Sequence, residues 1–564
     1  MTMHILLIDA LYITVLLALA WPLGVYMHQV YEGDFPRFAR PIRGVENWLC
    51  RAGGLGTLKP QGWQAYALAM LAFNVAGFVL LYAILRLQAV LPLNPDHIPP
   101  LSPAVAFNTA VSFVTNTNWQ AYSGEAQLSQ FSQMVGLTVQ NFVSAATGMA
   151  IAIAVVRGFT GPKSTTLGNF WVDLIRSVLY ILLPLSILLA LWLAIQGVPQ
   201  SFHGAVTATT LEGAHQVIPT GPVASQLAIK QLGTNGGGYF GVNAAHPFEN
   251  PTILSDLLQT LAILLIPAAL CITFGRMARD ARQGRALLIA MLLMFVAGLA
   301  VIQWQESLGN PLLHLAGGNM EGKEQRFGPA LSGLWAAATT AASNGSVNAM
   351  HDSFMPLSGL VMLVNMQVGE VIFGGVGAGL YGILLYVVLA VFLAGLMVGR
   401  TPEYLGRKIE RREVTLAMLA FLAMAVGILV AGAAVTVLPA GKAAISNPGP
   451  HGLSQILYAY SSFTGNNGSA FAGFNAADPL EAVLGGVIML LGRFAMILPM
   501  LALAGSMARK VRSEATAGTF PTHGPLFITL LVGTVVLLGA LTFFPALALG
   551  PIAEQVSLVA GQSF

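Results

Sequence analysis

The chain has 564 residues, of which 55% are hydrophobic and only 9% are charged. Soluble domains carry about 25% charged residues, so this composition excludes a soluble globular protein and indicates a polytopic membrane protein. The formal net charge of +3 is small, and no basic domain or interleaved aromatic stripe indicates nucleic-acid binding. The two cysteines, Cys50 and Cys271, fit neither a metal-site spacing nor a disulfide framework.

Ten apolar runs are long enough to be membrane spans, each of which needs about 20 residues. Nine runs lie near 5–27, 65–91, 130–156, 173–196, 252–274, 285–304, 414–438, 482–507 and 526–548. The first has no basic segment or cleavage site of a signal peptide, so we expect it to be retained. The tenth, 357–399, would be about 64 Å long as one helix, roughly twice the hydrocarbon core. We therefore expect this run to break, tilt strongly or protrude.

Four short polar segments recur along the chain, each after an apolar helical run. Aligned on Asn116, Asn235, Asn344 and Asn467, they are 109 to 123 residues apart. Four similar units at near-equal spacing predict four walls of one pore that binds an ion through backbone carbonyls. The predicted filter residues are Val114, Thr115, Asn116, Thr117, Gly233, Thr234, Asn235, Gly236, Ala342, Ser343, Asn344, Gly345, Gly465, Asn466, Asn467 and Gly468. The alternative is that these segments are ordinary surface turns.

A short helix is predicted to precede each polar segment, beginning near Pro103, Pro222, Pro329 and Pro450. The distance from each proline to the aligned Asn is 13 to 17 residues, which is enough to cross only half the bilayer. Such helices must be re-entrant, and their C-terminal dipoles favour a cation. The aligned segments contain no carboxylate, which favours a dehydrated monovalent cation over a divalent one.

The domain organisation predicted from these signals is all α-helical. Four pseudo-repeated units, each of span, pore helix and span, surround one central pore and are flanked by an extra first and last span. The predicted boundaries are 1–64 for the first span and loop, 65–156, 173–274, 285–399 and 414–507 for the four repeats, and 508–564 for the last loop and span. In the third repeat we expect the second helix to break near 374–379.

The distribution of basic residues predicts the orientation in the membrane. Twenty of the 26 lysines and arginines lie in the loops opposite the polar segments. The loops on the other side hold Lys230, Lys323, Arg326 and Lys442. By the positive-inside rule the polar segments and both termini face outward. These outer loops also carry an excess of carboxylates, which either concentrates cations at the pore mouth or is solvated loop charge.

Nine stretches of sequence resemble the KdpA family, the potassium-binding subunits of bacterial Kdp potassium-transporting ATPases. They are TNTNWQAYSGE at 115–125, GTNGGGYF at 233–240, AHPFENPT at 245–252, SNGSVNAMHDSF at 343–354, GEVIFGGVGAGLYG at 369–382, GRTPEYLGRKIE at 399–410, NPGPHG at 447–452, NNGSAFAG at 466–473 and PTHGPLF at 521–527. The resemblance covers nearly the whole chain. It implies the superfamily of potassium transporters, in the bacterial inner membrane, with K⁺ bound only at the filter.

The same resemblance implies partner subunits. They are a KdpB-type P-type ATPase subunit and the small KdpC- and KdpF-type subunits, with surrounding membrane lipid. In this family potassium is selected in the potassium-binding subunit and passes through an intramembrane tunnel to the pump subunit.

Two charged residues lie within predicted spans, Glu370 in the seventh and Arg493 in the ninth. Each is costly in lipid and must face protein or water, which makes an ion pair between them plausible. We expect either a salt bridge that fixes helix packing or a cation throttle below the filter. The glycines just beyond Glu370, namely Gly374, Gly375, Gly377 and Gly379, are expected to form a gate, or alternatively to allow close helix packing.

Motifs for ATP chemistry are missing from the sequence. It contains neither a G-x-x-x-x-G-K-[ST] phosphate loop nor a D-K-T-G phosphorylation motif. We therefore expect no ATP hydrolysis by this chain alone. The leading hypothesis is the ion-selecting subunit of an ATP-driven complex. The alternatives are a self-sufficient Trk/Ktr-like potassium channel or gradient-driven transporter, and a non-transporting membrane scaffold.

Overall fold

The computed structural model describes residues 3–53, 59–313, 317–514 and 519–562, so parts of the predicted terminal regions 1–64 and 508–564 lie outside the described residues. Ten helices in this part of the chain are long and apolar enough to span a membrane, which confirms the predicted number. They are Met3–Glu32 (α1), Trp63–Leu87 (α3), Ser132–Thr160 (a π-helical turn and α6), Phe170–Ile195 (α7, a π-helical turn and α8), Ile253–Met277 (α10), Ala281–Leu308 (α11), Ala378–Val398 (α14), Arg411–Val437 (α15, a π-helical turn and α16), Pro479–Arg509 (α19) and Pro525–Val559 (α20, a π-helical turn and α21).

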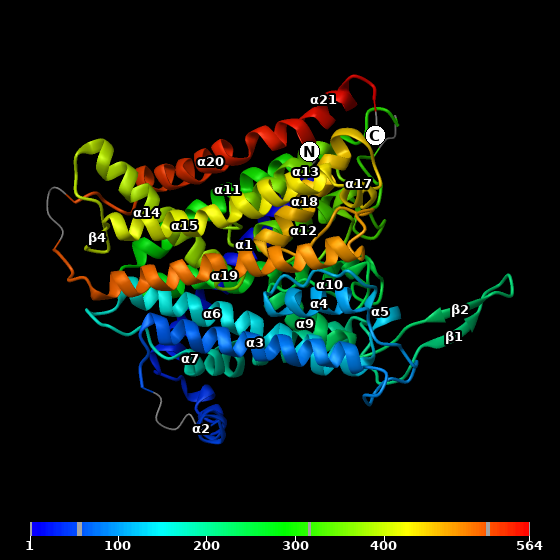
Figure 1. The fold of residues 1–564 in the computed structure, drawn as a ribbon, viewed down its shortest axis with the longest axis horizontal. Coiled ribbons are helices and arrows are strands. Elements are labelled where there is room, and N and C mark those ends of the chain that lie inside the picture. Colours follow the sequence, from blue (N-terminus) through cyan, green and yellow to red (C-terminus); the bar gives the residue numbers. More distant parts are fainter. Residues whose placement is uncertain (1–2, 54–58, 314–316, 515–518, 563–564) are drawn as a thin grey trace.

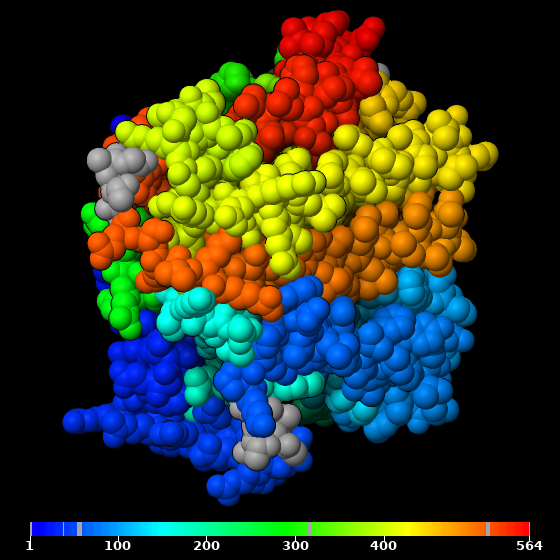
Figure 2. Space-filling model, turned by 60° about the vertical axis from the view of Figure 1, so that its left-hand side comes forward, coloured from blue at the N-terminus to red at the C-terminus, as the bar shows by residue number. Residues whose placement is uncertain are grey.

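These helices form one bundle in which burial separates inner from outer members. Helices α6, α10 and α14 are the most buried, whereas α1, α3 and α7–α8 are the least buried. A helix that is apolar all round and exposed in the protein is suited to face lipid. The first helix, α1, packs along α10, and α20 packs against α11 and α14. Figure 2 shows α19 (orange) lying between α15 (yellow) and α3 (blue) on one face.

The remaining helices are short. Four of them lead into the polar segments: α4 (Pro103–Val114), α9 (Val223–Leu232), α12 (Gly328–Ala341) and α18 (Gly449–Gly465). The others are α2 (Ile42–Ala52), α5 (Gly124–Gln127), α13 (Pro356–Gln367) and α17 (Pro439–Ala443). The prolines act as expected: Pro103, Pro329 and Pro450 lie in the first turn of their helices, and Pro222 is the residue before α9.

Two small antiparallel pairs of strands were not predicted from the sequence. Strands β1 (Val206–Thr209) and β2 (His215–Ile218) pair in register from Val206 with Ile218 to Thr209 with His215. This hairpin projects from one end of the bundle, and both termini lie toward that end (Figure 1). Strands β3 (Glu403–Tyr404) and β4 (Arg407–Lys408) form a tight turn before α15.

The long apolar run 357–399 is divided into two helices. Helix α13 ends at Gln367 and α14 begins at Ala378, and the intervening chain is not helical. Five residues in this interruption have positive φ: Gly369, Glu370, Phe373, Gly374 and Gly377. The interruption therefore begins before the predicted 374–379, and Gly379 lies in the first turn of α14.

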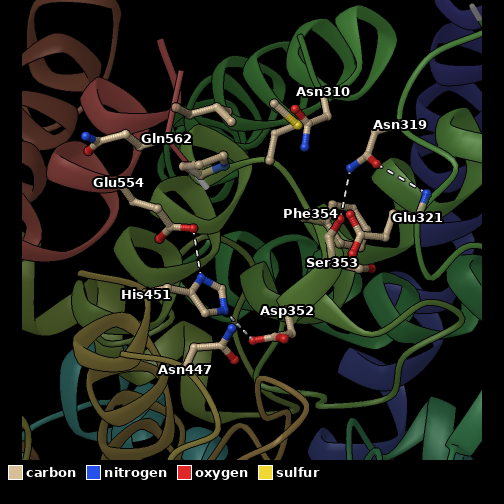
Figure 3. Close-up of a pocket in the computed structure, with 13 residues that line it drawn as sticks. Asn310, Asn319, Glu321, Asp352, Ser353, Phe354, Asn447, His451, Glu554 and Gln562 are labelled. Atoms are coloured by element: carbon tan, nitrogen blue, oxygen red, sulfur yellow. Dashed lines mark hydrogen bonds and ion pairs between the residues drawn. The ribbon is translucent and has the colours of Figure 1, made fainter. Parts of the chain in front are cut away.

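The C-terminal helix is tied to the loops around the polar segments by His451 (Figure 3). Its Nδ1 lies 2.8 Å from Glu554 Oε1 on α21, and its Nε2 lies 2.9 Å from Asp352 Oδ1. Burial opposes the imidazolium charge, but these two hydrogen-bonded carboxylates outweigh it and raise the pKa of His451 to about 10. The charged imidazole donates to one carboxylate on each side, which neither neutral tautomer can do.

Replacing His451 with Gln should therefore lower the thermal stability of the purified protein at pH 6 by about 2 kcal/mol. Because the folded-state pKa exceeds the ordinary value of 6.5, this contribution is complete below pH 6.5 and is lost as the pH rises through 10. The difference between wild type and H451Q should thus vanish near pH 10.5. His215→Gln, in the exposed β2 strand, is the matched control. A difference in stability that does not depend on pH would contradict the role of the charged His451 between Glu554 and Asp352.

Candidate functional site

The four polar segments begin where α4, α9, α12 and α18 end, and the chain turns back on itself in the same way each time. Every segment has two residues of positive φ separated by one: Asn116 and Asn118, Thr234 and Gly236, Ser343 and Gly345, and Asn466 and Gly468. The residue between them donates its backbone N–H to the carbonyl five positions earlier in every segment. These four bonds run from Thr117 to Ser112, from Asn235 to Lys230, from Asn344 to Thr339 and from Asn467 to Ser462. The segments therefore share one backbone conformation.

This conformation corrects the sequence alignment of the first segment by one residue. Thr117, rather than Asn116, corresponds to Asn235, Asn344 and Asn467, and Asn118 corresponds to the glycines. Val114, predicted as a filter residue, is the last residue of α4, and Asn118 takes its place in the set. The alignment was wrong because it used residue identity, whereas the repeated feature is the left-handed backbone, which Asn adopts more readily than most residues.

Side-chain hydrogen bonds join the four segments into a closed ring. Asn116 Nδ2 donates to the carbonyl of Thr234 (3.0 Å), and Asn344 Nδ2 donates to that of Lys230 (3.2 Å). Ser343 Oγ donates to the carbonyl of Asn466 (2.9 Å), and Asn466 Nδ2 donates to Thr117 Oγ1 (2.9 Å). The first segment thus contacts the second, the third contacts the end of α9 that leads into the second, the third also contacts the fourth, and the fourth contacts the first.

Glycines allow neighbouring segments to approach this closely. A Cβ added at Gly236 would collide with the carbonyl of Asn344, one at Gly345 with that of Asn467, and one at Gly468 with that of Thr117. The corresponding position of the first segment carries Asn118, and here the neighbouring second segment has Gly237, whose added Cβ would lie 2.6 Å from the Asn118 carbonyl. The unequal first segment is thus accommodated by a glycine on its neighbour.

Glu370 and Arg493 lie next to the ring and line one small cavity of about 20 Å³ together with Ser343, Gly465 and Asn466. The ion pair considered from the sequence is not formed in the described part of the chain. Glu370 Oε1 instead accepts from Asn467 Nδ2 (2.8 Å), and Arg493 Nη2 donates to the carbonyl of Ser144 (3.4 Å). Glu370 therefore supports the fourth segment, and Arg493 is held by α6.

The interruption between α13 and α14 also contacts the ring. Val376 N–H donates to Thr234 Oγ1 (2.8 Å), and Gly374 N–H donates to the carbonyl of Ala341 (2.9 Å). A Cβ on Gly375 would lie 3.3 Å from that of Ser343, and one on Gly377 would collide with the carbonyl of Gly148 on α6. The predicted gate residues are thus packed between the ring and α6.

Several of the carboxylates predicted on the outer side of the membrane are buried. Glu249, Asp256, Glu306 and Glu481 are each at most 1% exposed. Glu249 pairs with Lys230, and Glu306 with Lys323. These four therefore do not form a solvated, cation-attracting surface. The sequence signal that could have indicated the first pair is a lysine inside the apolar helix that leads directly into a polar segment.

Comparison with known proteins assigns the chain to a family. The family model described as the potassium-transporting ATPase A subunit, KdpA, matches residues 10–556. The chain belongs to the KdpA family. A "potassium-transporting ATPase potassium-binding subunit" of Rhodospirillum centenum is 60% identical over 100% of this chain and 99% of that protein. One from Pseudomonas aeruginosa is 59% identical over 98% of this chain and 99% of that protein.

A solved structure supports the fold. The potassium transporter TrkH from Vibrio parahaemolyticus superposes with a TM-score of 0.51, covering 86% of this chain and 96% of that chain. At 14% sequence identity this similarity shows the fold alone. Family membership argues against the alternative of a non-transporting membrane scaffold, since the family model describes a subunit of a potassium-transporting ATPase.

The packing of the interruption predicts different outcomes for two of its glycines. Gly377→Ala should abolish uptake and destabilise the protein by several kcal/mol, because the methyl group meets the Gly148 carbonyl at a positive φ. Gly369 also has a positive φ, but a Cβ there has nothing within 4 Å. Gly369→Ala should therefore cost only about 1 kcal/mol of backbone strain. Thermal unfolding and uptake of both variants test this, and equal losses would contradict the role of the contact.

Proposed function

We propose that the ring is the selectivity filter of an ATP-driven, high-affinity potassium uptake complex. It binds potassium from the outer side and passes it into the membrane toward a partner P-type ATPase subunit. The observation that carries this proposal is the closed ring of backbone and neutral side-chain dipoles contributed by four equivalent segments. Neutral carbonyl dipoles suit a dehydrated monovalent cation.

The proposed ion ligands are carbonyl oxygens of the corrected segments, 115–118, 233–236, 342–345 and 465–468. The proposed units around them keep the predicted boundaries, 65–156, 173–274, 285–399 and 414–507. In this arrangement the C-terminal ends of α4, α9, α12 and α18 meet at the ring, so their dipoles add to the negative potential there. The cation's charge is thus balanced without any carboxylate among the ligands.

The proposed partners and location follow from the family. Relatives of 59–60% identity are named as potassium-binding subunits of a potassium-transporting ATPase, which supports a non-catalytic role with ATP hydrolysis in a KdpB-type subunit. KdpC- and KdpF-type subunits complete the proposed complex. The proposed location in the bacterial inner membrane follows from the family, and the 20 basic residues predicted on the opposite side from the polar segments support an orientation with both termini outward. The likeness to TrkH concerns the fold, so it does not favour a self-sufficient Trk/Ktr-like transporter.

Arg493 is proposed as a throttle that prevents free ion flow. Arg493 lines the small cavity that Ser343 of the third segment and Asn466 of the fourth also line, and its side chain is almost fully buried. A buried positive charge repels a cation strongly because the surrounding dielectric constant is low.

The filter proposal predicts that Gly468→Ala raises the apparent KM for potassium at least tenfold, because the added methyl group displaces the Thr117 carbonyl. The assay is ATP-dependent potassium uptake by the complete complex in vesicles. Gly213→Ala is the matched control, since Gly213 also has a positive φ but no atom within 4 Å of an added Cβ. An unchanged KM in a folded G468A complex would argue against the ring as the filter.

The throttle proposal predicts that Arg493→Gln increases potassium movement that is not coupled to ATP hydrolysis. The measurement is the ratio of potassium transported to ATP hydrolysed in vesicles, together with passive potassium leak without ATP. Arg326→Gln is a control, because Arg326 pairs with Glu324 in a loop outside the cavity. Wild-type coupling and leak in R493Q would defeat the throttle.

A further inference from the structure

The second segment of the ring has a buried ion pair directly behind it. Of the four helices that lead into the ring, only α9 contains a lysine, arginine or carboxylate, which is Lys230. Its ammonium group contacts Glu249 Oε2, and both side chains are fully buried. Glu249 Oε1 in turn accepts from Phe240 N–H (2.9 Å). The pair is therefore enclosed between α9 and the chain that follows the second segment.

Lys230 determines which way the amide of Asn243 points. Its Nζ lies 2.7 Å from Asn243 Oδ1, and because an ammonium group can only donate, the oxygen of the amide must face it. The backbone N–H of Ala244 also donates to this oxygen, at 3.2 Å. The amide nitrogen consequently faces the ring, where it donates to the carbonyl of Gly236 (2.9 Å) and to Gln120 Oε1 (3.1 Å).

This contact makes the carbonyl of Gly236 different from its three counterparts. In the described part of the chain, no side chain donates to the carbonyls of Asn118, Gly345 or Gly468. A carbonyl oxygen has two lone pairs, so the bond from Asn243 occupies one and restricts the direction in which the other points. Two properties of a filter are held to set selectivity between monovalent cations, the size of the cavity and the number and field strength of the carbonyl dipoles, and a change in the direction of one carbonyl alters both.

The ion pair is better explained by this orienting effect than by stability. Burying two charges costs several kcal/mol per ion in desolvation, so a buried pair contributes little net stability compared with apolar residues. The carbonyl of Lys230 itself also accepts from Asn235 N–H, Gly236 N–H and Asn344 Nδ2. Lys230 thus contacts the second segment through its main chain and, by way of Asn243, through its side chain.

We propose that Lys230 is a positioning residue of the ring, which acts through Asn243 on the Gly236 carbonyl and thereby sets the discrimination between potassium and rubidium. This inference rests on the proposed filter function. It assigns to one segment a role in selectivity that the other three segments do not share.

Two variants test the inference in the complete complex, reconstituted in vesicles with its partner subunits. The first is Lys230→Met combined with Glu249→Gln, which removes the orienting ammonium without leaving a buried, unpaired charge. The second is Asn243→Gly, which removes the amide but suits the positive φ at this position. The readout is the ratio of the apparent KM for rubidium to that for potassium. Both variants should change it by about three- to tenfold, the range expected for one hydrogen bond.

The matched control is Lys323→Met with Glu306→Gln. This pair is equally buried, with 2.9 Å between Lys323 Nζ and Glu306 Oε2. Its other hydrogen-bond partners, the Glu321 carbonyl, Asn319 Nδ2, Met355 N–H and Ser358 Oγ, all lie outside the ring. It should fold and assemble with no change in the ratio. An unchanged ratio in assembled N243G, or in the assembled Lys230/Glu249 variant, overturns the inference. If the double variant does not fold, the KM ratio of N243G alone decides whether the inference holds.

The filter itself is tested separately by G468A. If G468A raises the KM for potassium while both Lys230-related variants keep the wild-type ratio, only the present inference fails. If G468A and these variants are all without effect, the proposed filter fails as well.

Discussion

The structure depends on one constraint, the need to satisfy backbone polar groups where four non-helical segments meet inside an apolar bundle. Unpaired N–H and C=O groups are very costly in such surroundings, so irregular backbone persists there only when protein or water satisfies it. The N–H groups in the middle of each segment bond back to the preceding helix, while side chains of adjacent segments bond to the carbonyls. The carbonyl oxygens keep free lone pairs, which a cation can use.

Charge placement around the ring follows the same electrostatic logic. The ring itself is neutral, whereas Glu370, Arg493 and the Lys230–Glu249 pair are buried beside or behind it. A carboxylate among the ligands would hold a cation too strongly for release and would favour a divalent ion. Charged side chains that lie behind the ligands, rather than among them, can instead orient neighbouring amides. They can also repel or attract the ion after it has left the ring. The asymmetry of the four segments thus resides largely in their surroundings.

The sequence predicted the parts of the structure that depend on composition and short-range signals. Apolar runs predicted ten spans, and proline at helix starts predicted the four short helices. The alignment of the first segment was wrong because Asn118 replaces a glycine in a left-handed conformation, which residue identity does not reveal. A lysine inside the apolar helix α9 indicates that Lys230 needs a partner, but its pairing with Glu249, 19 positions away, depends on how the loop folds back. The missing Glu370–Arg493 contact is likewise a matter of tertiary geometry.

The most direct test of the central claim is to locate the ion in an experimental structure of the whole complex, using the anomalous scattering of rubidium in place of potassium. The account predicts an anomalous peak inside the ring, coordinated by main-chain carbonyl oxygens from all four segments, 115–118, 233–236, 342–345 and 465–468. A peak coordinated by side-chain carboxylates, or a ring with no peak at saturating rubidium, would contradict it.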